Sequence, residues 1–248
     1  KGSIVAIVSL IKKNYLFNLI KLIRLNDGPL ISEEYIQIKE VIINSILKFI
    51  KKKYGRLISF APSYIYKNDN SFRNFITIKF NSFAKQTYII DLLNSEEELH
   101  KNLRSNWRNT LKKGLGYSNT KEIFDPKSIK SILQGYKEYA NKLKFTPVSN
   151  KKCIQWIKNN KNHNKLLSLK IYQSFSKHNQ EILGSIGILC FKDKALYLFG
   201  YTNEIGKKYQ ANSAMLWHAI IEIKKIGYKE FDLGGFNEKT GKGIKKFK

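Results

Sequence analysis

The segment from residue 197 to residue 233 constrains the fold of this chain more than any other. It begins with the strand-like stretch YLFGY, passes through the polar turn TNEIGKKYQ, and then carries apolar residues at helical spacing in SAMLWHAIIEIKK. The short segment YKEFDL, typical of a buried strand, follows. This succession predicts a strand, a basic turn, a helix over residues 212–226 and a further strand. The helix must bury its apolar face against a sheet, so we predict an α/β fold.

The rest of the chain alternates strands and helices in the same way. We predict further strands at residues 3–11, 57–62, 87–92, 166–172, 181–191 and 194–201, the last two joined by a tight turn at Lys192 and Asp193. Helical patterns cover residues 32–54, 95–113, 126–144 and 150–160, and Gly55 ends the first of them. The strand–helix–strand order occurs twice with a break near residues 91–94, which predicts two α/β halves, 1–90 and 91–248. Because the chain enters a strand directly after Lys1, we expect the first half to lack its N-terminal part.

The predicted helix over residues 95–113 carries two stripes with four-residue spacing. Ser95 and Glu98 have the spacing of a capping box at its start. One stripe is apolar, formed by Leu99, Leu103 and Trp107, and predicts the buried face. The other is basic, formed by Arg104, Arg108 and Lys112, and is either a contact for phosphate groups or a solvated face that complements the helix dipole.

The charge of the chain bears on its partners. Lysine and arginine total 45 against 19 aspartates and glutamates, which gives a formal net charge of +26. This favours a polyanionic partner: nucleic acid, an anionic membrane surface or a phosphorylated substrate. Nearly all of the positive charge is lysine, whereas proteins that read base edges usually use arginine.

The cysteines and the apolar runs exclude several classes of protein. Cys153 and Cys190 are isolated, so the sequence predicts neither a zinc site nor a disulfide framework. Few cysteines and many lysines fit a reducing cytoplasm. No apolar run approaches the roughly 18 residues that a membrane span needs.

The unit at residues 197–233 resembles the core of the GCN5-related N-acyltransferase (GNAT) fold. In that fold a glycine-rich turn opens the helix, and its backbone N–H groups hold the pyrophosphate of coenzyme A. This chain has Gln210, Ala211 and Asn212 where the glycines belong. Side chains there obstruct the close approach of a pyrophosphate, so we expect no coenzyme A site.

Several motifs, taken in order, resemble the FemABX family of non-ribosomal peptidyl transferases. The segment TYIIDLLNSEEELHKNLRSNWRNTLKKG resembles the opening of that family's second domain, and RLNDGPLI its Arg-Gly-Pro turn. The segments YKEFDLGGF and GKGIKKFK resemble an Asp-x-Gly-Gly strand end and a later Phe-Lys pair. The resemblance implies two GNAT-like subdomains, each a mixed sheet flanked by helices. It also implies transfer of an aminoacyl group from aminoacyl-tRNA to the amine of a muramyl-peptide precursor, nucleotide- or lipid-linked, without coenzyme A or metal.

The same resemblance assigns roles to particular residues. Lys248 matches the family's lysine that stabilises the oxyanion, and Phe247 is its partner at the substrate. Tyr197 matches a tyrosine that contacts the muramyl peptide, and Tyr201 is expected on the same face because it lies four residues further along the strand. Thr146, in the segment KFTPVS, matches a threonine near the substrate phosphates. Core packing of both tyrosines and solvation of the lysine are the alternative interpretations.

Two other functions stay open from the sequence alone. One is a GNAT N-acyltransferase that uses acyl-CoA on an envelope sugar or amine. The other is a non-catalytic basic module that binds RNA or the anionic inner face of a membrane. Asp232, beside two glycines, is expected to be a structural turn residue rather than a base, and His218 is expected to be solvated because it lies off the apolar helix face.

Overall fold

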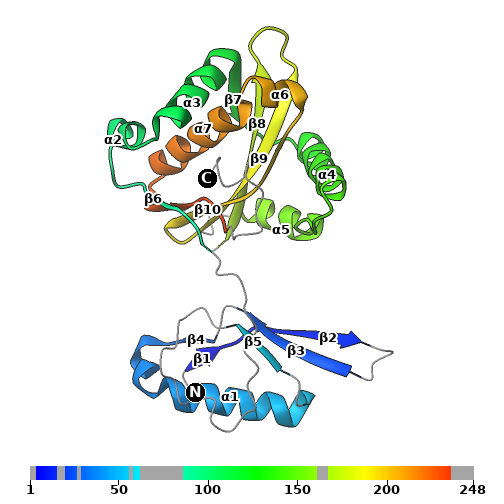
Figure 1. Cartoon of the computed structure of the whole chain (residues 1–248). Coiled ribbons are helices and arrows are strands. Elements are labelled where there is room, and N and C mark those ends of the chain that lie inside the picture. The colour runs from blue at the N-terminus through cyan, green and yellow to red at the C-terminus, as the bar shows by residue number, and fades with distance from the viewer. Residues whose placement is uncertain are drawn as a thin grey trace. The chain divides into compact units, whose positions relative to one another are not determined.

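The computed structural model describes residues 4–15, 20–26, 29–55, 58–61, 86–160 and 167–235. The chain divides into two compact units, Lys1–Asn81 and Ser82–Lys248 (Figure 1). The α/β class predicted from the sequence is confirmed in both. The predicted boundary after residue 90 falls inside strand β6 (Ile89–Asp91), which pairs with a strand of the second unit.

The first unit holds two small sheets and one long helix. Its elements are β1 (Ala6–Ile7), β2 (Leu10–Tyr15), β3 (Ile20–Asn26), β4 (Leu30–Ile31), the 3₁₀ helix η1 (Glu33–Ile38), α1 (Lys39–Tyr54) and β5 (Ile58–Ala61). Strands β2, β3 and β5 form one sheet, and β1 pairs with β4. Ile23, Leu25 and Ile50 form the core between the larger sheet and α1.

The prediction of one buried strand at residues 3–11 was wrong. The segment divides into β1 and the start of β2, and Ile7 and Ile11 are 59% and 44% exposed. The helix expected from residue 32 opens with the 3₁₀ turn η1 and ends, as predicted, before Gly55, whose φ is 113°. That φ lies in the region where glycine carries no steric penalty.

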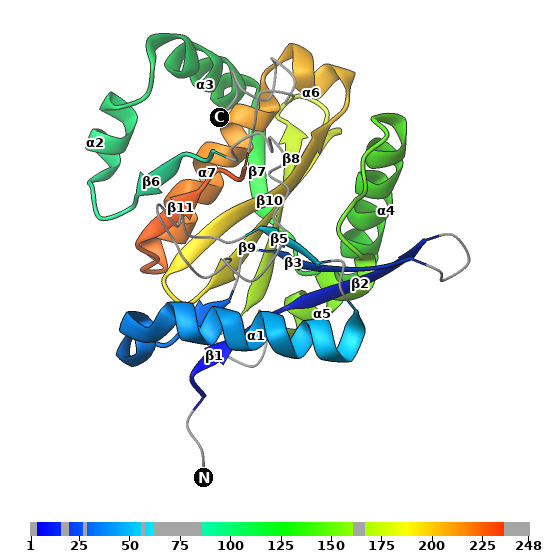
Figure 2. The ribbon, with the colours of Figure 1, turned by 60° about the horizontal axis from the view of Figure 1, so that its bottom comes forward.

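The second unit is built on a six-stranded mixed sheet in the order β6-β11-β10-β9-β8-β7 (Figure 2). Strands β10 and β11 are parallel, and every other neighbouring pair is antiparallel. Besides β6, its strands are β7 (Ser118–Glu122), β8 (Ser168–Ser176), β9 (Ile182–Phe191), β10 (Lys194–Thr202) and β11 (Glu230–Asp232). Its helices are α2 (Glu96–Lys101), α3 (Ser105–Tyr117), α4 (Pro126–Lys142), α5 (Asn150–Asn160), α6 (Glu204–Lys208) and α7 (Ala211–Lys225).

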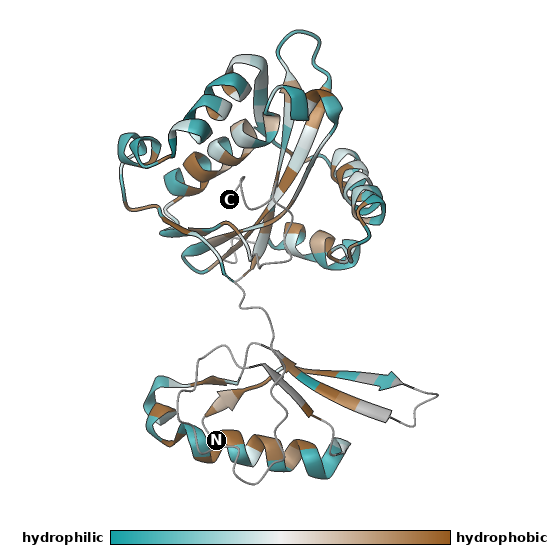
Figure 3. Cartoon of the chain, in the orientation of Figure 1, coloured by the Kyte–Doolittle hydropathy of each residue, from teal (hydrophilic) through white to brown (hydrophobic). Residues whose placement is uncertain are grey.

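Helices cover both faces of this sheet and create two cores. Residues of α2, α3 and α7 pack with the sheet in one cluster, and residues of α4 and α5 pack with it in the other. Within this unit, Figure 3 shows hydrophobic colour on α7 and the central strands, whereas much of α2, α3 and α4 is hydrophilic. The predicted strands at 166–172, 181–191 and 194–201 and the helices at 126–144, 150–160 and 212–226 are confirmed, with ends shifted by a few residues.

The helix predicted over residues 95–113 is two helices. The capping box of Ser95 and Glu98 is present at the start of α2. The chain then leaves the helix at residues 102–104 and starts α3 at Ser105. Arg108 occupies the break, since its Nη1 donates hydrogen bonds to the carbonyls of Lys101 and Leu103. These bonds satisfy carbonyl groups that the interrupted helix would leave unpaired.

Candidate functional site

The pairing between the parallel strands β10 and β11 ends early. The register runs from Lys194↔Glu230 to Leu196↔Asp232, and β10 then continues to Thr202, where β9 is its only strand partner among the described residues. The register with β9 shifts between Tyr197 and Phe199, which marks Leu198 as the extra residue of a β-bulge. A bulge bends its strand and increases the local twist, so β10 turns away from β11 after Leu196. The segment of β10 beyond this divergence is the centre of the candidate site.

The bulge sends the two predicted tyrosines to opposite faces of the sheet. Tyr197 packs against the cluster under α7, whereas Tyr201 packs against the cluster under α4. The Tyr201 hydroxyl donates to the Ile132 carbonyl of α4 at 3.1 Å. The prediction that both side chains share a face was therefore wrong, because one inserted residue reverses the alternation of side chains.

Glycines make room for the aromatic rings on either side of the bulge. A Cβ on Gly200 would meet the Tyr197 hydroxyl, and a Cβ on Gly187 would meet the Phe199 ring. The Tyr197 ring therefore lies along its own strand beneath α7, and the Phe199 ring lies across β9 beneath α4. Only glycine permits this close approach of a ring to the backbone.

Asn212, in the first turn of α7, faces Tyr197. Burial raises the pKa of the Tyr197 phenol, and hydrogen bonding by the Asn212 side chain opposes that rise. The phenol is consequently neutral at physiological pH and can donate a hydrogen bond. The Asn212 Oδ1 atom is buried and has no hydrogen-bond partner among the residues that the structure describes. A buried acceptor left unpaired costs roughly 1–3 kcal/mol, which a donor from a bound molecule would recover.

The first turn of α7 does not fit the pyrophosphate of coenzyme A. Gln210, the residue before α7, has a φ of 62°, and its carbonyl lies so close to α3 that a Cβ on Gly114 would be 2.6 Å from the oxygen. Ala211 is fully buried, and Ser213 is almost so. Pyrophosphate binding needs a turn that a ligand can approach closely, and here the turn carries side chains in place of glycines and its Gln210 carbonyl packs against α3.

Asp232 closes the opposite side of the divergence between the two strands. Its Oδ1 accepts hydrogen bonds from the Gly234 N–H, at 2.7 Å, and from the Thr87 hydroxyl. Such a bond to the backbone two residues further on is the ordinary role of an aspartate in a turn. The contacts agree with the structural role expected for this residue.

The other predicted site residues are dispersed. Arg104 precedes α3 and is exposed, Lys112 is exposed on that helix, and Arg108 is engaged with backbone carbonyls, so the three do not form one row of available cations. Thr146 is exposed in the loop between α4 and α5. Phe247 and Lys248 lie outside the described residues.

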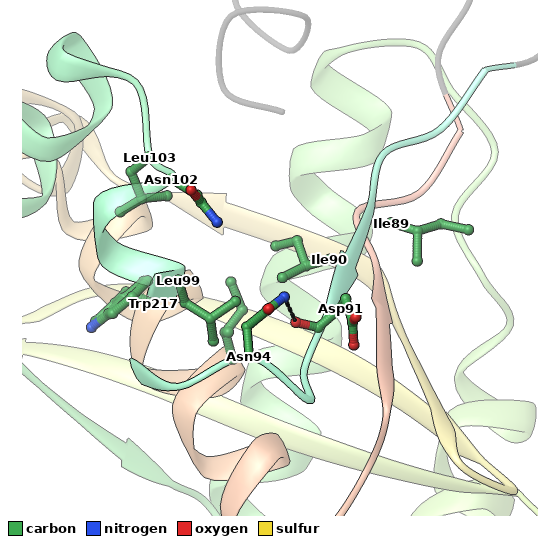
Figure 4. A pocket seen from close by; sticks show the side chains of 9 residues that line it. Ile89, Ile90, Asp91, Asn94, Leu99, Asn102, Leu103 and Trp217 are labelled. Carbon is green, nitrogen blue, oxygen red and sulfur yellow. Dashed lines mark hydrogen bonds between the residues drawn. The ribbon is translucent and has the colours of Figure 1, made fainter. Parts of the chain in front are cut away.

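A separate pocket of about 250 Å³ lies between β6, α2 and α7 (Figure 4). Asn94 Nδ2 donates to the Asp91 carbonyl at 3.1 Å on one wall, and the side chain of Asn102 points into the hollow from the break between α2 and α3. The lining is mainly apolar and is made by Ile89, Ile90, Asp91, Asn94, Leu99, Asn102, Leu103, Trp217 and Ile220. Sequence patterns missed this pocket because they placed Asn102 and Leu103 inside a continuous helix.

Among the described residues, two further kinds of feature matter for function: clusters of metal-ligating side chains and helices able to cross a membrane. No group of three or more histidine, cysteine, aspartate or glutamate side chains gathers there in a way that could hold a metal ion. Within the same residues, no helix combines the length and the apolarity that crossing a membrane requires.

Comparison with known proteins identifies the fold. Residues 170–248 match a family model described as an acetyltransferase (GNAT) domain, and no curated protein matches the sequence. FemX is similar over 97% of this chain and 78% of its own, with a TM-score of 0.68 and 11% identity. L-PGS from Bacillus licheniformis has a TM-score of 0.57 and 12% identity over 93% of this chain and 67% of its own. A tandem GNAT protein from the clavulanic acid biosynthesis pathway has a TM-score of 0.55 and 9% identity over 97% of this chain and 73% of its own.

These similarities confirm the expected resemblance at the level of the fold. The six-stranded sheet with helices on both faces is GNAT-like, and FemX shares the fold along nearly the whole chain. The described part of the first unit, with its three-stranded sheet and single long helix, does not by itself show a second GNAT-like subdomain.

Proposed function

We propose that this protein transfers an aminoacyl group from aminoacyl-tRNA to the amine of a peptidoglycan precursor. The observation that carries the proposal is the coincidence of an ordered set of FemABX-like motifs with a FemX-like fold over 97% of the chain. The acceptor would be a muramyl pentapeptide, nucleotide-linked or lipid-linked, and the product would begin an interpeptide bridge. The reaction would take place in the cytoplasm, with peripheral contact to the inner face of the membrane when the acceptor is a lipid.

The structure of the α7 turn supports an RNA-linked donor over coenzyme A. The α7 start has Gln210, Ala211 and Asn212 in place of glycines and packs against α3, which disfavours close approach of a pyrophosphate, so a donor held elsewhere is the better fit. An RNA donor also matches the net charge of +26, because a basic surface strengthens the binding of a polyanion.

The proposed chemistry is direct attack of the acceptor amine on the ester. The amine nitrogen bonds to the carbonyl carbon, and negative charge develops on the carbonyl oxygen. The bond from that carbon to the ribose oxygen then breaks, and the proton lost by the amine is taken up by the departing oxygen. Lys248, with Phe247 beside it, would stabilise the oxyanion, an interaction typically worth roughly 3–4 kcal/mol.

We assign the acceptor contact to Tyr197 and Asn212. The Tyr197 ring can pack against the precursor, and Asn212 Oδ1, which accepts no hydrogen bond from a described residue, can accept from its amine or amide N–H. Tyr201 is less suitable because its hydroxyl is bound to Ile132 beneath α4. Thr146 remains a proposed contact for the phosphates of the precursor.

The test is transfer of a labelled amino acid from charged tRNA to a muramyl pentapeptide by the full-length protein. We expect Lys248→Met to lower the transfer rate by roughly 100- to 1,000-fold, the usual loss when one oxyanion donor is removed. The matched control, Lys246→Met, removes the same charge from the same segment and should retain activity. Absence of transfer from any charged tRNA, together with turnover of acyl-CoA, would refute the proposal.

A GNAT N-acyltransferase is the second candidate, favoured by the acetyltransferase family model that matches residues 170–248. It keeps the fold and replaces the donor with acyl-CoA, acting on an envelope sugar or amine. Calorimetry with acetyl-CoA separates the two candidates. Micromolar binding would support the second, and the absence of glycines from the α7 turn leads us to expect none.

A further inference from the structure

An aromatic and basic surface is formed where α3 ends beside the β8–β9 turn and α6. Tyr117, the last residue of α3, stacks on Tyr209 between α6 and α7, with ring centroids 3.5 Å apart and planes at 2°. The His178 ring, from the turn, is 5.2 Å from that of Tyr117. Lys208 and Lys113 place their ammonium groups over the Tyr209 ring, at 5.4 and 5.9 Å from its centroid. With the exposed Lys112, these residues define what we call the tyrosine–lysine surface.

No acid of the described residues forms an ion pair with the cations of this surface. Helix α3 contains no aspartate or glutamate. In α6, the Glu204 carboxylate forms an ion pair with Lys207 at 2.7 Å and not with Lys208. Within the described residues, Lys112, Lys113 and Lys208 are exposed and form no ion pair. The surface therefore carries uncompensated positive charge beside half-buried aromatic rings.

Backbone contacts fix the segments that form this surface. The Lys177 N–H donates to the Tyr117 carbonyl at 2.9 Å, and its Nζ donates to the Leu115 carbonyl at 2.6 Å, which ties the β8–β9 turn to the end of α3. The close approach of Gly114 to the Gln210 carbonyl ties α3 to the start of α7. The aromatic stack is consequently held by packed elements on both sides.

The tyrosine–lysine surface adjoins the start of α7, which also carries Asn212 of the site at the bulge of β10. Tyr209 immediately precedes Gln210, and Asn212 in the following turn is the residue that faces Tyr197. A chain molecule bound along the surface could thus extend its end toward Tyr197. Aromatic rings and lysines together suit single-stranded nucleic acid, whose bases stack on rings and whose phosphates pair with cations.

We propose that the tyrosine–lysine surface binds the single-stranded 3′ end of the RNA donor. Bases stack on the Tyr117–Tyr209 pair, and Lys112, Lys113 and Lys208 contact the phosphates. The inference rests on the proposed function for the identity of the RNA, but its evidence is the surface itself. It also moves the RNA contact away from Arg104 and Arg108 and retains Lys112.

The experiment measures binding of a short fluorescent single-stranded RNA ending in CCA to the full chain, by anisotropy over a range of salt concentrations. Tyr209→Leu should weaken binding by roughly 5- to 100-fold, the usual effect of removing one stacking ring. Tyr209→Phe keeps the ring and should bind like the native protein. The double variant Lys113→Gln, Lys208→Gln should reduce the slope of log affinity against log salt by about 1.4, since each phosphate contact to a single strand contributes about 0.7.

The matched control is the double variant Lys130→Gln, Lys137→Gln, which removes two exposed lysines from α4, on the other face of the sheet. This control should change the RNA affinity and the salt slope by less than the double variant Lys113→Gln, Lys208→Gln does. Equal losses in the two double variants would show a diffuse charge effect and overturn the inference. Competition of the RNA by free coenzyme A, or binding to phosphatidylglycerol vesicles in place of RNA, would also overturn it.

The transfer assay distinguishes failure of this inference from failure of the proposed function. Transfer from charged tRNA with an unchanged KM in Tyr209→Leu would refute the surface and leave the function standing. Surface-dependent RNA binding without any transfer would support the surface and refute the function. Thermal unfolding of each variant shows whether it is folded. If Tyr209→Leu does not fold, the RNA affinity of Tyr209→Phe is compared with that of the native protein.

Discussion

At the scale of single residues, His218 shows how packing across the sheet changes the state of a side chain. From its position off the apolar helix face we expected it to be solvated. Its ring is instead half-buried and lies in a T-shaped contact with the Tyr172 ring, with centroids 5.7 Å apart and planes at 77°. Burial lowers the pKa of His218, Lys225 lowers it further, and Glu222 and Glu122 oppose the shift.

This shift predicts how stability depends on pH. A histidine whose pKa is lower in the folded state than its ordinary 6.5 binds more protons when unfolded. Its contribution to stability is therefore complete above about pH 6.5 and is lost as the pH falls toward the folded pKa. Denaturant titrations at pH 5 and pH 7.5 should show a larger loss of stability for the native protein than for His218→Gln. Equal losses would contradict the burial of this ring.

At the scale of elements, two local interruptions shape the second unit. Leu198 interrupts the alternation of β10, and the turn at residues 102–104 separates α2 from α3. Both alter where side chains point: the first separates Tyr197 from Tyr201, and the second opens the pocket of Figure 4. The bulge depends on pairing with β9, and the break depends on hydrogen bonds from Arg108 of α3 to carbonyls of the preceding turn, so neither is visible in the apolar periodicity.

The packing of α3 on α7 is tested by two glycines in the same helix. A Cβ on Gly114 would lie 2.6 Å from the Gln210 carbonyl and 3.0 Å from the Ala214 Cβ, whereas a Cβ on Gly116 would meet nothing within 4 Å. Gly114→Ala should therefore reduce the free energy of unfolding by roughly 1–3 kcal/mol through overpacking. Gly116→Ala should increase it by roughly 0.5–1 kcal/mol through helix propensity. Denaturant melts measure both, and stabilisation by both substitutions would show that α3 does not approach α7 this closely.

At the scale of the whole molecule, the second unit is one sheet shared by two cores. Cys190 lies in the cluster under α7, and Cys153 lies in the cluster under α4 and α5. Both thiols are buried, and burial raises the pKa of Cys153 to about 11 and that of Cys190 to about 12. The reactive thiolate is therefore scarce in the native state on either face.

We expect both cysteines to react slowly with a thiol reagent in the native protein and rapidly after unfolding. Because the two cores share the same strands, the faces should open together and protect both thiols by a similar free energy. Peptide-level mass spectrometry of the labelled native protein resolves the two sites without any substitution. Much faster labelling of Cys153 than of Cys190 would show instead that α4 and α5 open separately from the sheet.

The sequence by itself determined the α/β class, most strands and helices of the second unit, the capping box at Ser95 and the turn at Gly55. These features depend on side-chain periodicity and on backbone preferences, which act within a few neighbouring residues. It did not predict the edge strand β7, whose polar sequence SNTKE lacks an apolar pattern and pairs only because β8 lies beside it. The bulge that separates Tyr197 from Tyr201, the helix break at Arg108 and the stack of Tyr117 on Tyr209 likewise needed the tertiary structure. In each case the deciding hydrogen bond or ring contact comes from another element, and local periodicity carries no information about that partner.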